Sequence, residues 1–128
     1  MTYEQMKVLE FHQKYGCAVN TKPTMPDAQT RLLRARLIVE EAAEFLAAAE
    51  RADMVEMCDA LADVLYVVYQ AGVVMGVDLS YIFDVVHASN MTKDGGRDSG
   101  GKVLKGTNFR PPDIASELRE QGWNPRGE

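Results

Sequence analysis

The segment from Asp53 to Gly76 constrains the fold most strongly, because it is a long helical pattern with a start and a stop signal. Asp53 and Glu56 have the spacing of a helix-capping box, and glycine is a common residue at a helix end. Within this segment begins an apolar run of 14 residues, 64–77, which is too short to span a membrane. We therefore predict a core helix over residues 54–75.

The rest of the chain shows the same helical periodicity, separated by loop signals and without a convincing strand pattern. The predicted helical segments lie between Thr2 and Gly16, from Ala28 to about Arg51, from 54 to 75, from Asp78 to Asn90 and, as a shorter segment, within Asp113–Gln121. Thr2 and Gln5 also have capping-box spacing. We predict an all-α fold, an antiparallel four-helix bundle with an irregular C-terminal tail.

The length of 128 residues fits one domain, 1–128, with a helical body over 1–93 and a basic, Gly/Pro-containing tail over 94–128. The two cysteines have no metal-ligand spacing, and the N-terminus has no secretory signal. These features indicate a cytoplasmic protein with reduced thiols and no membrane partner.

Charge is unevenly distributed along the chain. The net charge is -5, yet residues 87–110 carry five basic and two acidic side chains, so this stretch is +3 and the remainder is -8. An acidic body argues against a nucleic-acid partner. The basic stretch also holds glycines at 95, 96, 100, 101 and 106, so we expect a mobile lid that an anionic ligand orders.

Acidic side chains cluster on the second and third predicted helices, at Glu40, Glu41, Glu44, Glu56, Asp59 and Asp63. If these helices form an antiparallel hairpin turning near Ala52, Glu41 and Asp63 lie at the same height, because each is 11 residues from the turn. At about 1.5 Å rise per residue, the carboxylates of Glu41, Glu44, Asp59 and Asp63 converge within about one helical turn.

A solvated helix face is the ordinary explanation for acidic residues, but it explains Asp63 poorly because Asp63 interrupts an apolar sequence. An ionised carboxylate there costs several kcal/mol unless a cation compensates it. Arg34 or Arg36 could supply a structural ion pair instead. Oxygen ligands without histidine or cysteine favour Mg²⁺, with Mn²⁺ possible.

The acidic pattern resembles the all-α nucleoside triphosphate pyrophosphohydrolases, which include MazG-like proteins, dimeric dUTPases and phosphoribosyl-ATP pyrophosphatases. Their signature is EExxE followed by ExxD, and residues 40–44 match the first half. The second half can be aligned in two registers. Glu56 and Asp59 have the ExxD spacing, whereas Asp63 is followed by the residues that usually follow the family's aspartate. The second register places Ala60 where the family has glutamate, so we expect Asp59 to substitute, with Glu56 as the alternative ligand.

The resemblance continues through residues 86–93, where Asn90 and Lys93 match positions facing the nucleotide, and through residues 101–112. It implies a homodimer or homotetramer in which helices from more than one subunit complete the site. Lys102 and Lys105 lie in the second of these segments and would bind phosphate as point charges.

The predicted activity is metal-dependent hydrolysis of a nucleoside triphosphate to the monophosphate and pyrophosphate. Glu41, Glu44, Asp59 and Asp63 would hold the metal, and Glu40 would orient or deprotonate the attacking water. Phosphoribosyl-ATP is an alternative substrate. A nucleotide-binding sensor and a non-enzymatic helical metal-binding bundle are the alternatives from other functional classes.

Overall fold

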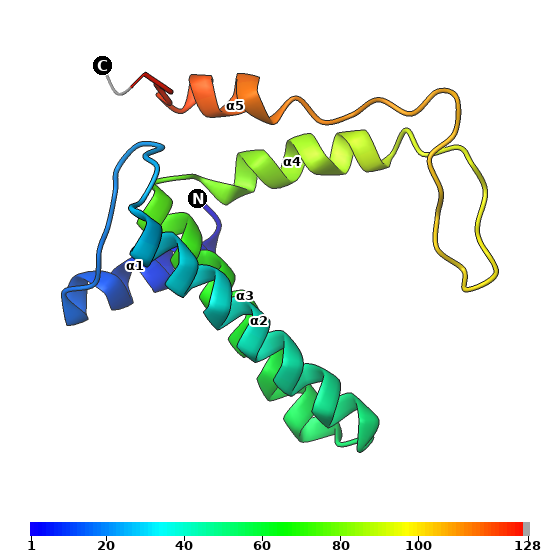
Figure 1. Ribbon diagram of the computed structural model, residues 1–128, viewed down its shortest axis with the longest axis horizontal. Coiled ribbons are helices and arrows are strands. Elements are labelled where there is room, and N and C mark those ends of the chain that lie inside the picture. Colours follow the sequence, from blue (N-terminus) through cyan, green and yellow to red (C-terminus); the bar gives the residue numbers. More distant parts are fainter. Residues whose placement is uncertain (127–128) are drawn as a thin grey trace.

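The computed structural model describes residues 1–126, and every regular element in that range is a helix (Figure 1). The helices are α1 (Tyr3–Tyr15), α2 (Ala28–Glu50), α3 (Met54–Met75), α4 (Leu79–Asn90) and α5 (Ile114–Glu120). The predicted all-α class and the predicted helical segments are therefore confirmed. The last two residues of the predicted tail, 127–128, lie outside the described range.

A tight turn at Ala52 reverses the chain between α2 and α3, as the sequence predicts. The amide of Asp53 donates to the carbonyl of Ala48 (3.1 Å), and the amide of Ala52 donates to that of Ala49 (3.0 Å). Ala52 has a left-handed φ of 54°, so these bonds form a Schellman motif with alanine where glycine is usual. The motif fixes the height of every residue on α2 against α3.

Small side chains allow α2 and α3 to approach closely near the turn. Ala48 on α2 is 1% exposed and Ala60 on α3 is 5% exposed, so both are buried near the turn. At the other end of the hairpin α1 packs on α3, where the rings of Phe11 and Tyr66 meet edge to face at 5.5 Å. The core is consequently concentrated on α3.

Gln5 connects α1 to the junction between α3 and α4, a role that the sequence pattern does not reveal. Thr2 caps α1 as predicted, by accepting from the Gln5 amide (3.0 Å). The Gln5 side chain does not return to Thr2, however. It donates to the carbonyl of Val77 (2.7 Å) and accepts from the amide of Leu79 (3.1 Å), two backbone groups at the helix junction. The reciprocal half of the predicted capping box is therefore absent.

After this junction α4 runs away from the hairpin, with α5 alongside it (Figure 1). The Gln121 side chain fixes the start of α4, because it accepts from the Asp78 amide (2.8 Å) and donates to the Asp78 carbonyl (3.1 Å). An apolar groove of about 500 Å³ separates α3 from α4 and is lined by residues that include Leu65, Tyr69 and Phe83. Within one chain, α4 and the α2–α3 hairpin therefore diverge from each other.

The glycine-rich part of the tail, where we expected a lid, folds back on itself as a short ribbon joined by backbone hydrogen bonds. The amide of Gly95 donates to the Leu104 carbonyl (3.0 Å), and the Leu104 amide donates to the Gly96 carbonyl (2.9 Å). An antiparallel bridge joins Arg97 to Val103. The sequence pattern misses this ribbon because it is short and its residues do not alternate between apolar and polar.

By length and composition alone, α3 as a whole could cross a membrane, although its apolar run is shorter than a membrane span. Core helices of soluble proteins have the same composition, and one such helix is weak evidence for a membrane span. Here α3 packs against both α1 and α2, which is the environment of a core helix.

Replacing Gln5 with alanine should lower the free energy of unfolding by about 1–3 kcal/mol, because the buried groups of Val77 and Leu79 lose their partner. Urea denaturation measures this change. Gln13→Ala is the matched control, since Gln13 is exposed on the same helix and should cost little. Equal effects of the two substitutions would show that the Gln5 bonds do not hold the junction.

Candidate metal centre

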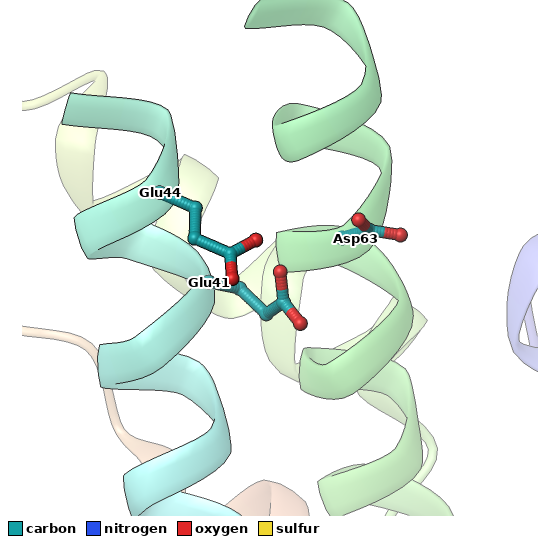
Figure 2. Close-up of side chains that lie close together, drawn as sticks. All are labelled: Glu41, Glu44 and Asp63. Carbon is teal, nitrogen blue, oxygen red and sulfur yellow. The ribbon is translucent and has the colours of Figure 1, made fainter. Parts of the chain in front are cut away.

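Three carboxylates meet between α2 and α3, on the side chains of Glu41, Glu44 and Asp63. Each offers one oxygen, and these oxygens lie within 4.8 Å of one another. Glu41 and Glu44 reach from consecutive turns of α2 toward α3, which carries Asp63 (Figure 2). The Ala52 turn makes this possible because it sets Glu41 level with Asp63, as predicted from their equal distance to the turn.

The electrostatic environment of Glu41 disfavours its ionised form. Partial burial raises the pKa of Glu41 above its ordinary value of 4.5, and the neighbouring carboxylates of Glu44, Asp63 and Glu40 raise it further. The Oε2 atom of Glu41 is inaccessible to solvent and has no hydrogen-bond partner. A buried carboxylate oxygen without a partner is costly, so this position favours a bound cation.

The chain does not supply that cation from its own side chains. Within residues 1–126 the one ion pair joins the N-terminal amine to Asp78 (2.8 Å), and neither Arg34 nor Arg36 pairs with Asp63. Asp63 is also only half-buried, and its apolar neighbours Leu61 and Leu65 are 48% and 54% exposed. The expectation of a deeply buried Asp63 is therefore wrong for the single chain, although its carboxylate still belongs to the cluster.

The donor set fits a hard divalent cation. All candidate ligand atoms are carboxylate oxygens from two helices. They lie close together without a basic side chain between them. Mg²⁺, Mn²⁺ and Ca²⁺ prefer oxygen ligands, whereas zinc prefers sulfur and imidazole nitrogen. Glu41, Glu44 and Asp63 could thus hold a divalent metal.

Asp59 and Glu56 lie beside the cluster and not within it. Both line a pocket of about 240 Å³ that shares Glu44 with the cluster and has Ala60 in its wall. The Asp53 side chain caps α3 by accepting a hydrogen bond from the Glu56 amide (3.1 Å). The Glu56 carboxylate is therefore not needed for capping, contrary to the capping-box interpretation.

Arg51 is a pocket residue that the sequence reasoning missed. It lines the same pocket as Glu44, Glu56 and Asp59, and so places one positive charge among three carboxylates. Arg51 follows Glu44 by seven residues, which puts the two on one face of α2. This spacing could have identified it.

The other predicted site residues lie outside the cluster. Glu40 is exposed on α2 next to Glu41. Asn90 is exposed at the end of α4, and Lys93, Lys102 and Lys105 follow it on the segment that leaves α4. In Figure 1 this segment lies well apart from the α2–α3 hairpin. One chain does not bring these predicted phosphate-binding residues to its own carboxylates.

Fold and site together define an all-α protein whose helical hairpin carries a cluster of three carboxylates. The family model for phosphoribosyl-ATP pyrophosphohydrolase matches residues 8–90, which include α2, α3 and α4. The chain belongs to this family, which is part of the MazG-like all-α nucleoside triphosphate pyrophosphatase superfamily. Its members typically use a divalent metal, in agreement with the cluster. The resemblance inferred from the acidic motif is confirmed.

A curated relative is the "Uncharacterized protein L479" of Acanthamoeba polyphaga mimivirus, which is 38% identical to this chain over 76 residues. The match covers 56% of this chain but 30% of the viral protein. The chain therefore corresponds to under a third of that relative's length.

Asp59→Ala should weaken Mg²⁺ binding on the order of tenfold, the size of effect that even outer-shell ligands produce, and more than Glu56→Ala does. Asp59 is one helical turn from Asp63, whereas Glu56 is two turns away. Calorimetric titration with Mg²⁺ measures both. Stronger loss from Glu56→Ala would instead support Glu56 as the ligand.

The raised pKa of Glu41 predicts a pH-dependent response to Mg²⁺. A proton on Glu41 stabilises the metal-free fold below the ordinary value of 4.5, and this contribution is lost as pH rises through the raised pKa. Mg²⁺ should therefore raise Tm more at about pH 8 than at about pH 5. Glu41→Gln should reduce the shift, and Glu50→Gln, outside the cluster on α2, should not. A shift of equal size at both pH values in the unmodified protein would contradict this prediction.

Proposed function

We propose that this protein hydrolyses a nucleoside triphosphate between its α and β phosphorus atoms and releases the monophosphate and pyrophosphate. The observation that carries the proposal is the three-carboxylate cluster with its unpartnered Glu41 oxygen. Membership of a pyrophosphohydrolase family supports the same chemistry. Reaction consumes one water, whose oxygen joins one phosphorus as the phosphoanhydride bond breaks.

Mg²⁺ is the proposed metal, with Mn²⁺ as the other candidate. Glu41, Glu44 and Asp63 hold it, and Asp59 completes the ligand set from the adjacent turn of α3. A divalent cation held by these carboxylates would supply positive charge to offset the negative charge on the phosphate oxygens. The carboxylates also repel an unmetallated triphosphate, so this site selects a nucleotide that arrives with its metal.

Glu40 is the proposed general base. It is exposed beside Glu41 and is turned by about 100° around α2, so it can face a water without serving as a ligand. Asn90 and Lys93 at the end of α4 bind the nucleotide, and Lys102 and Lys105 bind its phosphates. Arg51 adds a further cation to the pocket beside the cluster.

Phosphoribosyl-ATP is a second candidate substrate, because the matching family model is named for its hydrolysis. Both substrates contain the same α–β phosphoanhydride, and the carboxylate cluster does not discriminate between them. A nucleotide-binding sensor is the alternative without turnover, and the position of Ala60, where relatives carry glutamate, favours it over a purely structural bundle.

We also propose that the active form is a homodimer or homotetramer. Apolar side chains are exposed on each bundle helix, including Val39 on α2, Leu65 on α3 and Phe83 on α4, the last of these 70% exposed. The groove between α3 and α4 is also apolar. A second copy offers helices of matching character, which would bury these surfaces and close the bundle.

Asp63→Asn should reduce pyrophosphate release by at least about a hundredfold, because one of the cluster's charges is lost. The metal-free variant should be at least as stable as the original, since like-charge repulsion decreases. Pyrophosphate detection with Mg²⁺ and a panel of ribo- and deoxyribonucleoside triphosphates plus phosphoribosyl-ATP measures turnover. Glu50→Gln is the control.

The panel separates the alternatives. Binding of nucleotides without pyrophosphate release supports the sensor. Release from phosphoribosyl-ATP alone assigns the family's named substrate. Neither binding nor release with any member of the panel would overturn the proposed function.

A further inference from the structure

Three aromatic side chains, which we call the aromatic cluster, meet where α1 packs on α3. The centroid of the Phe11 ring lies 4.7 Å from that of Tyr15 and 5.5 Å from that of Tyr66, the second pair edge to face. These contacts hold the rings in a defined arrangement. Tyr15 is nevertheless 61% exposed and Tyr66 is 37% exposed. The cluster therefore keeps aromatic surface accessible to a ligand.

The aromatic cluster adjoins the carboxylates on the same helix. Tyr66 follows Asp63 by three residues on α3. Side chains at this spacing are neighbours on a helix, with Cβ atoms about 5–6 Å apart. In a nucleotide, only one sugar separates the base from the α phosphate. A nucleotide whose phosphates are held at the carboxylates can therefore place its base against the Tyr66 ring.

Polar groups surround the Tyr66 hydroxyl. Partial burial raises the pKa of Tyr66 above its ordinary value of 10.0, and the neighbouring groups of Tyr15, Cys17 and Glu10 raise it further. Tyr66 is therefore a neutral phenol at physiological pH. Glu10 is exposed on α1 and forms no ion pair within residues 1–126. A carboxylate accepts hydrogen bonds and does not donate them, so Glu10 favours a ligand with a donor.

The nucleobases differ in the donors that they offer to such an acceptor. Adenine, guanine and cytosine carry an exocyclic amino group, whereas uracil and thymine do not. A carboxylate accepts from an amino group but repels a carbonyl oxygen. Stacking on an aromatic ring, in contrast, tolerates every base, because every base has a π face. Stacking and a carboxylate acceptor together would bind bases generally and select those with an amino group.

We propose that the aromatic cluster is the base-binding subsite of the nucleotide held at the carboxylates, and that Glu10 selects bases with an exocyclic amino group. The base stacks on the exposed ring surface of the cluster, and Glu10 accepts a hydrogen bond from its amino group. This inference rests on the proposed function and adds the class of base. The stacking rings and the selecting carboxylate belong to α1 and α3 of one chain.

Equilibrium binding tests the subsite without turnover. The probes are the α,β-methylene analogues of dCTP and dUTP, in which the scissile bond cannot be hydrolysed, each titrated calorimetrically with Mg²⁺ present. Tyr66→Leu should weaken binding of the cytosine analogue about tenfold, and Tyr66→Phe should preserve it, because stacking needs the ring. Tyr3→Leu is the control, since Tyr3 is an exposed tyrosine of α1 outside the cluster. Tyr15→Leu, at the most exposed ring of the cluster, provides a second variant should Tyr66→Leu not fold. Unchanged binding in folded Tyr66→Leu and Tyr15→Leu proteins would overturn the subsite.

The same pair of analogues tests the selection by Glu10, because the two bases differ in an amino against a carbonyl group. The original protein should bind the cytosine analogue about tenfold more tightly than the uracil analogue. Glu10→Gln should largely remove this preference, because an amide also donates, and Glu4→Gln on the same helix should not. Equal affinity of the original protein for both analogues, or a preference that persists in Glu10→Gln, would overturn the selection.

The two proposals fail in different ways. The expected preference in a protein that releases no pyrophosphate from dCTP would overturn only the proposed function. Equal pyrophosphate release from dCTP and dUTP, with binding that is indifferent to the Tyr66 and Glu10 substitutions, would overturn only this inference. Binding of neither analogue would overturn both.

Discussion

The register of α2 against α3 is the constraint on which the rest of the structure depends. Three residues separate the helices, and the Schellman motif at Ala52 leaves the chain one way to reverse. Buried alanines at 48 and 60 then let the helices approach closely. A shift of one residue would rotate Asp63 by about 100° around α3 and remove it from Glu41. The carboxylate cluster is therefore a consequence of one turn and two small side chains.

The cluster is also a source of instability in the isolated chain. Three carboxylates with oxygens within 4.8 Å repel one another, and Glu41 responds with a raised pKa. The hairpin tolerates this repulsion because the helices are held together elsewhere, by the packing of α1 on α3 and by the bonds of Gln5. The bonds of Gln5, at the end of the hairpin away from its turn, are therefore among the contacts that offset the repulsion between the carboxylates.

The open position of α4 connects the fold to the proposed oligomer. The α3–α4 groove is apolar, and the segment from Lys93 to Arg110 carries a net charge of +3. The exposed apolar area of the groove is unfavourable in one molecule, because its contact with water costs free energy. We propose that a second copy covers this area. The same association would bury apolar side chains that are exposed on the other bundle helices.

The sequence by itself determined the helices, their caps and the pairing of Glu41 with Asp63. These features are local or follow from counting residues around one turn, so periodicity and capping residues are sufficient to predict them. The tertiary structure decided where Gln5 bonds, that Asp59 lies beside the cluster, that the tail is a ribbon and that α4 leaves the hairpin. Each of these depends on contacts between residues far apart in the chain, or on the angle between helices. Hydrophobic periodicity shows which face of a helix is apolar, but it does not show whether the same chain or another one covers that face.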